Sequence, residues 1–269
     1  MAVDWESLPT EELLDVRLCD LGLTVSDTWL ADCVERLRDE LDAVGLRKFR
    51  VHTWLSDEWC SPDGVPGVGI PFYLAHSRLI RLERQMMFEV EGGTQAECMR
   101  LLRHEAGHAL QHAYNLQRRK RWQRAFGKAS DPYPEFYRPN PMSKGFVEHL
   151  DGWYAQAHPV EDFAETFAVW LAPRSNWRKR YASSQARGKL EYIDELVEDL
   201  SEKKPQVKSR ARPYSLPSLR HTLRQHYERR QDHYSPGFSV EYVRDLLKIF
   251  SDSARYRNNE TAASFLRRN

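Results

Sequence analysis

The segment His104-Glu105-Ala106-Gly107-His108 constrains this chain more than any other part of its sequence. A spacing of four residues places the two histidines one above the other on a single helical face, where both rings can reach one metal ion. Glu105 projects about 100° around the helix from His104, since one turn contains about 3.6 residues. Its carboxylate therefore lies beside the metal, in a position to act as general base toward metal-activated water. The segment predicts a zinc ion held by His104 and His108.

The residues before this segment predict that it lies on a buried helix. Thr94 and Glu97 have the spacing of a capping box, and apolar residues recur at helical spacing after them. A five-residue match also arises by chance, and two histidines on an ordinary helix are the alternative interpretation. We favour the metal site because the capped amphipathic pattern, with Gly107 permitting close approach of another segment, is more than an ordinary helix requires.

A catalytic zinc ion needs a third protein ligand and one open position. The best source is a second predicted helix, residues 159–172, which begins at a proline and is stopped by the next one. We assign Glu165 as the third ligand. Glu161, one turn earlier, is the competing candidate. Asp162 is instead a candidate to accept a hydrogen bond from a ligand histidine and so orient its ring.

Peptide hydrolysis also needs a donor that stabilises the oxyanion of the tetrahedral intermediate. Tyr154 and His158 closely precede the second helix and are our two candidates for this catalytic role. Packing is the competing explanation for each of them. His112 lies one further turn along the first helix; it is a candidate to line the cleft, and we do not assign it as a ligand.

The two motifs together resemble a family of bacterial zinc-binding metallopeptidases within the gluzincin branch of the zincins. The resemblance rests on residues 104–108 and on the run 154–168, which contains Glu-Asp-Phe-Ala-Glu, and it extends over about residues 65–172. It implies an α+β zincin-like domain with zinc at His104, His108 and Glu165 and with Glu105 catalytic. Many members of that family carry a cysteine-rich zinc ribbon before the peptidase domain, whereas this chain has no paired cysteines there.

Hydrophobic periodicity predicts the remaining elements. Residues 10–44 fit two helices with a break near 22–27, and residues 49–55, 70–74 and 79–82 fit strands of a small sheet. Zincin substrates add as an extended strand to such a sheet, so we expect the substrate-binding edge at 70–74 or 79–82. A helix over about 189–200 completes a predicted domain, residues 1–200.

The C-terminal part has a different composition. Residues 203–217 contain three prolines, and we interpret residues 201–217 as a linker. Residues 218–269 form the predicted basic helical extension, with helices over 218–233 and 239–250 and weak order after 255. The chain beyond residue 200 has 15 basic and 7 acidic residues, against 25 and 32 before it, so a basic tail follows an acidic body.

The basic tail is the basis of an alternative function, a zincin-fold regulatory or binding module that acts on nucleic acid or a protein partner. Basic and aromatic residues cluster in it, but no recognised nucleic-acid motif accompanies them, so a solvated helix face is the favoured interpretation. A tail that folds back over the cleft and inhibits it is a further possibility. The residues in question are Arg210, Arg212, Tyr214, Arg220, Arg224, His226, Tyr227, Arg229 and Arg230.

Composition limits the remaining classes of protein. The 269 residues are 41% hydrophobic and 29% charged, which fits a folded protein with a sizeable core. The four cysteines are far apart, and neither a secretory signal nor a membrane-spanning run is evident, so we expect a cytoplasmic protein. The leading function is a zinc endopeptidase that acts on a peptide or protein substrate. The target, the cleavage preference and the oligomeric state are not encoded in these patterns.

Overall fold

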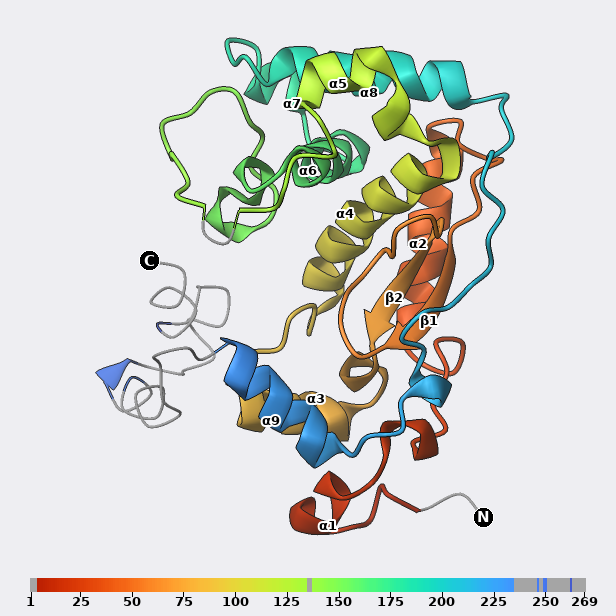
Figure 1. Cartoon of the computed structure of the whole chain (residues 1–269), viewed down its shortest axis with the longest axis vertical. Helices are drawn as coiled ribbons and strands as arrows, with labels where there is room; N and C mark the ends of the chain where they lie inside the picture. The colour runs from red at the N-terminus through yellow and green to blue at the C-terminus, as the bar shows by residue number, and fades with distance from the viewer. Residues whose placement is uncertain (1–3, 135–136, 235–245, 247–248, 251–261, 263–269) are drawn as a thin grey trace.

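The fold is known from a computed structural model that describes residues 4–134, 137–234, 246, 249, 250 and 262 (Figure 1). It combines many helices with a small two-stranded sheet, in agreement with the predicted α+β class. The helices are α1 (Thr10–Leu14), α2 (Leu30–Ala43), α3 (Ser77–Met87), α4 (Gln95–Tyr114), α5 (Lys120–Phe126), α6 (Pro159–Leu171), α7 (Trp177–Arg180), α8 (Arg187–Leu200) and α9 (Leu223–Tyr234). The strands are β1 (His52–Ser56) and β2 (Gly67–Pro71). None of the described helices is both long enough and apolar enough to cross a bilayer.

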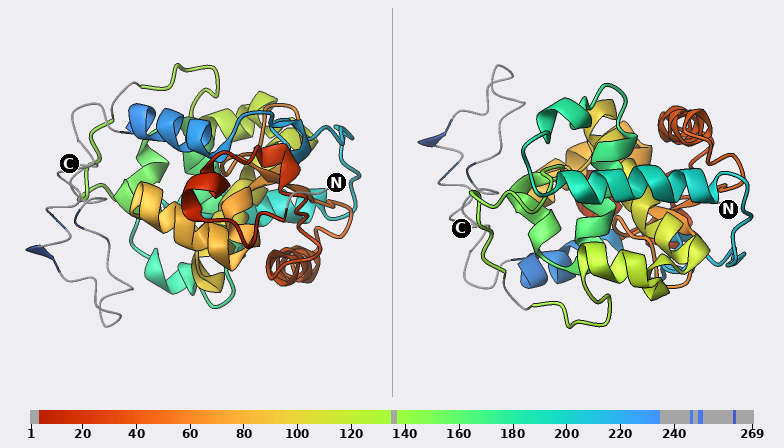
Figure 2. Two further views of the ribbon diagram at one scale, coloured as in Figure 1. Left: turned by 90° about the horizontal axis from the view of Figure 1, so that it is seen from below. Right: turned by 90° about the horizontal axis from the view of Figure 1, so that it is seen from above.

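The helix α4 runs through the middle of the molecule and links its two halves. Helices α5 to α8 lie at one end of α4, whereas α1, α3 and α9 lie at the other, with α2 and the sheet along its side (Figure 1). Seen from below, α9 lies beside α3, and seen from above, α8 crosses the molecule near α6 (Figure 2). Fifteen of the twenty α4 residues are buried, so this helix belongs to the core over almost its whole length.

The start of α4 is fixed by the predicted capping box. The Thr94 side chain accepts a hydrogen bond from the Glu97 backbone N–H, and the Glu97 carboxylate accepts one from the Thr94 N–H. Farther along, the buried Arg103 forms two hydrogen bonds of 2.7 and 2.8 Å to Glu40 of α2. Paired charges of this kind anchor two helices to each other because separating them would leave each charge desolvated and alone. The register of α4 against its neighbours is therefore set both at its start and near its middle.

Close contact between α4 and α6 depends on Gly107. A Cβ atom at this position would lie 2.8 Å from the Ala164 Cα and 3.2 Å from its carbonyl oxygen, so only glycine lets the backbones approach this far. The two histidines of α4 lie one turn apart around this crossing point, and Glu161 and Glu165 of α6 face them. The packing of two small residues thus brings the two sequence motifs together.

The sheet is smaller than the sequence predicted. Strand β1 pairs with β2 in parallel, from His52 opposite Gly67 to Ser56 opposite Pro71. Only the start of the predicted strand 70–74 lies in β2, because Phe72–Ala75 forms a 3-10 helix. The predicted strand 79–82 is wrong, since these residues lie within α3. Short apolar runs do not distinguish a strand from a buried helical turn.

Each outer edge of the sheet is occupied at one position, at the middle of β2 and at the end of β1. Cys60 forms an antiparallel bridge to Gly69 of β2, with hydrogen bonds of 3.2 and 2.8 Å between the two backbones. On the other side, Ser56 of β1 forms an antiparallel bridge to Ser215. Neither of the two segments that we predicted as the substrate-binding edge, 70–74 and 79–82, therefore forms a free edge strand. The segment around Cys60 lies along β2 and forms the rim of the cavity there.

Residues 201–217 form a strap that is attached to the body along its length. The backbone N–H groups of Gln206 and Val207 both donate to the Ala113 carbonyl at the end of α4. Farther on, Trp54 of β1 donates its indole N–H to the Pro213 carbonyl at 2.9 Å. The composition of a flexible linker is thus misleading here, because distant residues supply partners that no local pattern reveals.

Helix α9 packs on the N-terminal half and not away from it. Leu223 and Tyr227 are fully buried, and Arg224 forms ion pairs with Glu11 and Asp15 next to α1. Arg230 is paired with Glu83 of α3. Four residues that we named as candidates for nucleic-acid contact therefore pack against or pair with other parts of the chain: Arg224, His226, Tyr227 and Arg230. The predicted helix over 239–250 and the weak order expected beyond 255 fall largely outside the described residues.

Candidate metal centre and active site

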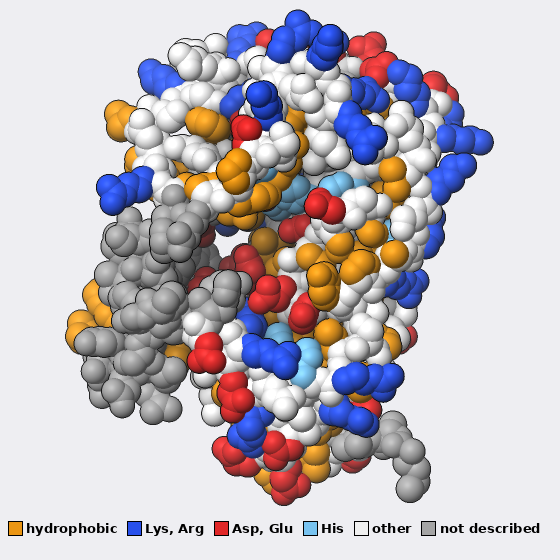
Figure 3. Space-filling model, in the orientation of Figure 1, with side chains coloured by type: hydrophobic (Ala, Val, Ile, Leu, Met, Phe, Trp, Pro, Cys, Tyr) orange, Lys and Arg blue, Asp and Glu red, His pale blue; other side chains and the backbone are white. Residues whose placement is uncertain are grey.

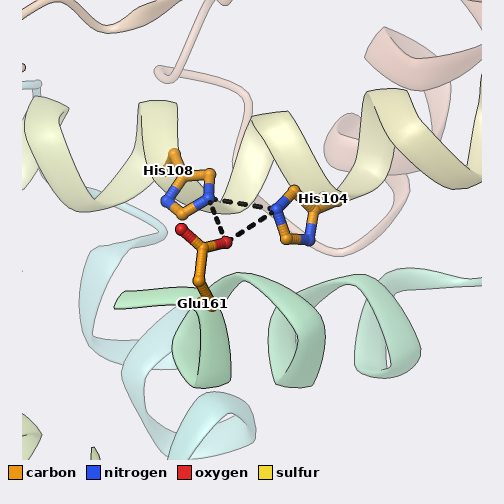
Figure 4. A group of neighbouring side chains, drawn as sticks. All are labelled: His104, His108 and Glu161. Atoms are coloured by element: carbon orange, nitrogen blue, oxygen red, sulfur yellow. Dashed lines mark hydrogen bonds and ion pairs between the residues drawn. The ribbon is translucent and has the colours of Figure 1, made fainter. Parts of the chain in front are cut away.

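Helices α4 and α6 bring two histidines and one glutamate to a common point (Figure 4). His104 Nε2 lies 3.1 Å from His108 Nε2, and each of these nitrogens lies 3.2 Å from Glu161 Oε2. All three side chains are largely shielded, with exposed fractions of 4%, 12% and 7%. Three potential ligand atoms thus form an almost equilateral triangle in a protected site.

This triangle fits zinc. Zinc binds histidine nitrogen and carboxylate oxygen at about 2.0–2.2 Å, so two corners of a tetrahedron around it are separated by roughly 3.3–3.5 Å. The observed separations of 3.1 and 3.2 Å are close to that value. Two imidazoles and one carboxylate are also a donor set of catalytic zinc sites, which leave one position open. The residues present therefore fit the metal that the motif predicts.

The structure places Glu165 differently from the ligand role that we predicted for it. Its Oε1 lies 2.8 Å from His104 Nδ1, on the opposite side of the ring from the Nε2 triangle, and its Oε2 accepts a hydrogen bond from the Leu150 backbone N–H at 2.8 Å. Glu165 is fully buried. A carboxylate in this position fixes the ring orientation and keeps the proton on Nδ1, so that Nε2 is free to bind a metal. The competing candidate, Glu161, occupies the place that we had assigned to Glu165.

Asp162 also has a role other than the one considered for it. Its carboxylate forms an ion pair of 2.6 Å with Lys189 of α8, and the same Lys189 ammonium donates to the Gly145 carbonyl at 2.7 Å. Burial raises the pKa of Asp162 to about 7 against the opposing effect of Lys189. Through Lys189, Asp162 therefore connects α6 to α8 and to the loop that contains Gly145. It does not contact His104 or His108.

Burial and the neighbouring charges have opposing effects on the pKa of each residue at the site. Burial would lower the pKa of His104, but hydrogen bonds to Glu161 and Glu165 outweigh it and raise that pKa well above its usual value. Burial raises the pKa of Glu105, and the neighbouring histidines oppose this shift. The buried carboxylates of Glu161 and Glu165 thus stabilise the charged form of the His104 imidazole. A metal ion would take over that positive charge.

Glu105 lines the same cavity as the two histidines but does not belong to the triangle. It is buried, with 8% of its surface exposed. Its place beside the histidine pair agrees with the orientation expected one residue along the helix. A carboxylate here can accept a proton from a water molecule next to the metal position.

Tyr154 and His158 occupy different environments. Tyr154 lines the cavity, and its ring centroid is 5.9 Å from that of His104. His158 caps α6 instead: its Nδ1 accepts the Val160 backbone N–H, and its Nε2 donates to the Asp131 carbonyl. Both nitrogens of His158 are engaged, and its side chain is not among those lining the cavity. Of our two candidate oxyanion donors, only Tyr154 faces the site.

Tyr133 is a site residue that sequence reasoning missed. Its hydroxyl donates to Glu161 Oε1 at 2.7 Å, and its ring stacks on His158 at a centroid distance of 3.9 Å. This contact holds the Glu161 carboxylate with its Oε2 toward the histidines. Tyr133 lies in a proline-rich loop with no motif of its own, so no signal in the sequence identifies it.

The site opens into a cavity of about 750 Å³. The space-filling view shows this face of the molecule hollowed between its two halves, with histidines inside the hollow and acidic side chains along its lower side (Figure 3). His112 lines the cavity as expected, and its Nδ1 accepts a hydrogen bond from the Gly64 backbone N–H. His112 therefore supports the loop that forms the rim, and it does not belong to the triangle of His104, His108 and Glu161.

Comparison with known proteins agrees with this geometry. Residues 96–196 match the family model described as putative zinc-binding metallo-peptidase, which confirms the family resemblance predicted from the two motifs. The match includes all of α4 except its first residue, the loop that contains Tyr133, and α6, so it contains all the residues of the triangle. Comparisons with curated proteins and with solved structures found no match.

Proposed function

We propose that the protein is a zinc-dependent endopeptidase whose metal is held by His104, His108 and Glu161. The observation that carries this proposal is the triangle of His104 Nε2, His108 Nε2 and Glu161 Oε2, with sides of 3.1–3.2 Å in a shielded site. The match of residues 96–196 to a zinc-binding peptidase family supports the same chemistry. When bound, zinc would supply a Lewis acid that lowers the pKa of water to about 7.

The residues around the triangle have distinct roles in this proposal. Glu165 orients His104 through the 2.8 Å contact to Nδ1, and Tyr133 orients Glu161. Glu105 accepts the proton of the attacking water and passes it to the leaving amine. Tyr154 donates its hydroxyl to the carbonyl oxygen of the scissile bond as negative charge develops there.

The substrate backbone has a candidate binding edge in the rim segment Trp59–Ser61, which lines the cavity. The backbone N–H and C=O of Cys60 both point to Gly69 of β2. Backbone groups alternate in direction along an extended chain, so those of Trp59 point away from β2 and are suited to pair with a peptide. The cavity of about 750 Å³ has space for a short peptide segment that extends past the scissile bond, which favours an endopeptidase.

The decisive experiment compares wild type, Glu105→Gln and Glu12→Gln. Glu12 is an exposed residue of α1 outside the cavity, so its variant is a matched control for loss of one carboxylate. We expect one zinc per chain in all three proteins, and a loss of peptide cleavage by at least roughly a thousandfold in Glu105→Gln alone. Stoichiometric zinc without cleavage of any unfolded protein or peptide by the wild type would refute the peptidase.

A further inference from the structure

The strap, residues 201–217, is held to the body of the protein mainly through its backbone. Three alternate residues of β1, from His52 to Ser56, donate side-chain hydrogen bonds of 2.9–3.2 Å to carbonyl groups of residues 211–214. At the start of the strap, the Tyr114 hydroxyl of α4 donates to the Lys203 carbonyl at 2.9 Å. Because carbonyl groups supply these contacts, most side chains of the strap are left for other uses.

Four cations of the strap take no part in this attachment. They are exposed, and within the described residues their side chains form no ion pair and no hydrogen bond, unlike Lys203, which is paired with Asp199. The sequence contains no acidic residue from position 203 to position 227, so no local carboxylate balances them. The four cations are Lys204, Lys208, Arg210 and Arg212.

These cations form a row along one edge of the molecule. The strap runs past α4 and β1 without forming a helix or strand, and Lys and Arg side chains gather along the edge that it follows (Figure 1, Figure 3). All even-numbered residues from 204 to 214 are exposed, whereas 205, 207, 209 and 213 are partly buried. Alternate residues of an extended chain lie roughly 6–7 Å apart. The last three cations are therefore spaced at regular intervals, which suits an anionic polymer with a charge on every unit better than a single small anion.

An exposed aromatic ring stands at the end of this row. Tyr214 is 61% exposed, and its φ of 55° lies in the left-handed region, which residues with a Cβ atom rarely adopt. Its carbonyl accepts a hydrogen bond of 3.2 Å from the Ser56 hydroxyl, so the backbone below the ring is fixed. An aromatic ring beside a line of cations is the arrangement on which the bases of single-stranded nucleic acid stack.

A cavity of about 430 Å³ adjoins the same end of the row. Arg212 lines it, and Glu35, which also lines it, is paired with Arg38 at 2.9 Å and adds no uncompensated charge. The other walls combine apolar side chains with hydroxyl groups, a mixture that suits a flat ring with polar edges. They include Leu23, Val25, Leu55, Thr24, Ser26 and Ser215. Independently of the charges, the cavity thus favours a polymer that carries bases.

We propose that the row Lys204, Lys208, Arg210 and Arg212, together with Tyr214 and the cavity at Arg212, binds single-stranded nucleic acid. The cations contact phosphates, the tyrosine ring stacks on one base, and the cavity receives another. A single strand is required because the bases of a duplex are paired and are not free to enter the cavity.

This surface is separate from the catalytic cavity. The strap borders β1, whereas the rim segment around Cys60 borders β2 at the opposite edge of the sheet. Nucleic acid and peptide therefore occupy different places, and the inference does not depend on the proposed function.

The test measures binding of the full-length protein to a fluorescent oligothymidylate of about 20 nucleotides, by anisotropy at several salt concentrations. Combined substitution of Lys208→Gln, Arg210→Gln and Arg212→Gln should weaken binding roughly tenfold or more. It should also lower the steepness of log affinity against log salt by about 2, since each phosphate contact with a single strand contributes about 0.7. The single variant Arg210→Gln disturbs the fold least and should lower the steepness by about 0.7.

A matched control removes the same charge elsewhere. Lys120→Gln, Arg124→Gln and Lys128→Gln change three exposed cations in and next to α5, and together they should alter the affinity by no more than about twofold. An equal loss in both triple variants would indicate only the overall charge of the protein and would overturn the proposal. Tyr214→Ala should weaken binding roughly fivefold or more without changing the salt dependence, and an unchanged affinity would contradict stacking on this ring.

Competitors separate nucleic acid from other anionic partners. An abasic strand of the same length and a duplex should each compete roughly tenfold less well than the single strand. Equal competition by the abasic strand would identify a site for any polyanion, and tighter binding of the duplex would refute recognition of a single strand. Stronger competition by phosphatidylserine vesicles would assign the row to a membrane surface, which also overturns the proposal.

The two proposals for this protein fail separately. Glu105→Gln should bind the oligonucleotide as wild type does, because Glu105 lines the other cavity. Oligonucleotide binding by a protein that cleaves no peptide would refute the peptidase and keep the nucleic-acid surface, and cleavage without oligonucleotide binding would do the reverse.

Discussion

Two helix pairs in this molecule bury carboxylates, and they do so with different partners. Between α4 and α6, Glu161 and Glu165 contact two histidines. Between α3 and α9, Glu83 contacts Arg230. A guanidinium has five N–H donors, no acceptor and a permanent charge, so it neutralises a carboxylate but has no lone pair with which to bind a metal ion. Neutral imidazoles offer lone pairs instead, and two lone pairs that converge with a carboxylate oxygen create a place for a metal ion.

The comparison shows that burial of charge does not by itself identify a functional site. The two pairs are similar in burial, and both join elements distant in sequence. What separates them is whether the partner can exchange its proton for a metal. The following predictions test this difference, starting with the largest expected effect.

The first prediction contrasts Glu161→Gln with Glu165→Gln, two identical changes one helical turn apart. Loss of a direct ligand should reduce both zinc affinity and cleavage by roughly a thousandfold or more, about 4 kcal/mol. Loss of the orienting contact to His104 should cost about 10- to 100-fold in zinc affinity. Zinc competition titrations measure both effects. A larger effect at Glu165 would restore the ligand assignment that the sequence suggested.

The second prediction concerns the structural pair. Arg230→Met leaves Glu83 buried without its cation, so we expect the free energy of unfolding to fall by about 3 kcal/mol in urea titrations. Adding Glu83→Leu should recover much of the loss, because the unpaired charge is then removed as well. Zinc stoichiometry should stay the same in both variants. If zinc is lost with Arg230, the two helix pairs are not independent.

The third prediction targets the contact that brings α4 and α6 together. The Cβ of a Gly107→Ala variant would lie 2.8 Å from the Ala164 Cα, so the helices must separate. We expect roughly 1–3 kcal/mol of destabilisation and a parallel decrease in zinc affinity. Gly188→Ala is the matched control, since its Cβ would meet none of the described residues within 4 Å, and it should be neutral or stabilise α8. Equal behaviour of the two variants would contradict the close-approach argument.

The smallest expected effect is the pH response of the α3–α9 region. His226 is buried, and its Nε2 has no hydrogen-bond partner among the described residues; burial, followed by the charges of Arg230 and His221, lowers its pKa to about 3. The unfolded chain, with a histidine pKa near 6.5, therefore binds more protons, and this contribution to stability is full above pH 6.5 and declines as pH falls toward 3.

At pH 5.5 the loss attributable to His226 should be about 1 kcal/mol relative to pH 7.5. A His226→Phe variant should lack this part of the decline in thermal or urea unfolding. The same acid sensitivity in wild type and variant would place its origin elsewhere.

Local signals predicted α4 well because its determinants are all near one another in sequence. Thr94, Glu97 and the apolar spacing specify where the helix begins and which face it buries, and the histidine spacing follows from helix geometry. The choice between Glu161 and Glu165 is of another kind. Both lie on the same face of α6, and only the crossing with α4 at Gly107 determines which one meets the histidine Nε2 atoms.

Sequence patterns failed where the partner of a segment is far away along the chain. The strand predicted over residues 79–82 is part of α3, since four apolar residues carry too little periodicity to distinguish the two structures. Residues 203–217 read as a linker because their prolines and charges exclude a regular element. Their attachment to Ala113 and Trp54 depends on backbone carbonyls, which have no signature in the sequence.

The return of the chain through the strap has a consequence for biosynthesis. The ribosome releases the candidate metal ligands of α4 and α6 before it has made α9, yet Arg230 of α9 forms part of the cavity wall. A nascent chain that ends before this helix can bring the histidines and Glu161 together but has an incomplete cavity. During synthesis the cavity is therefore completed only after α9 has been made.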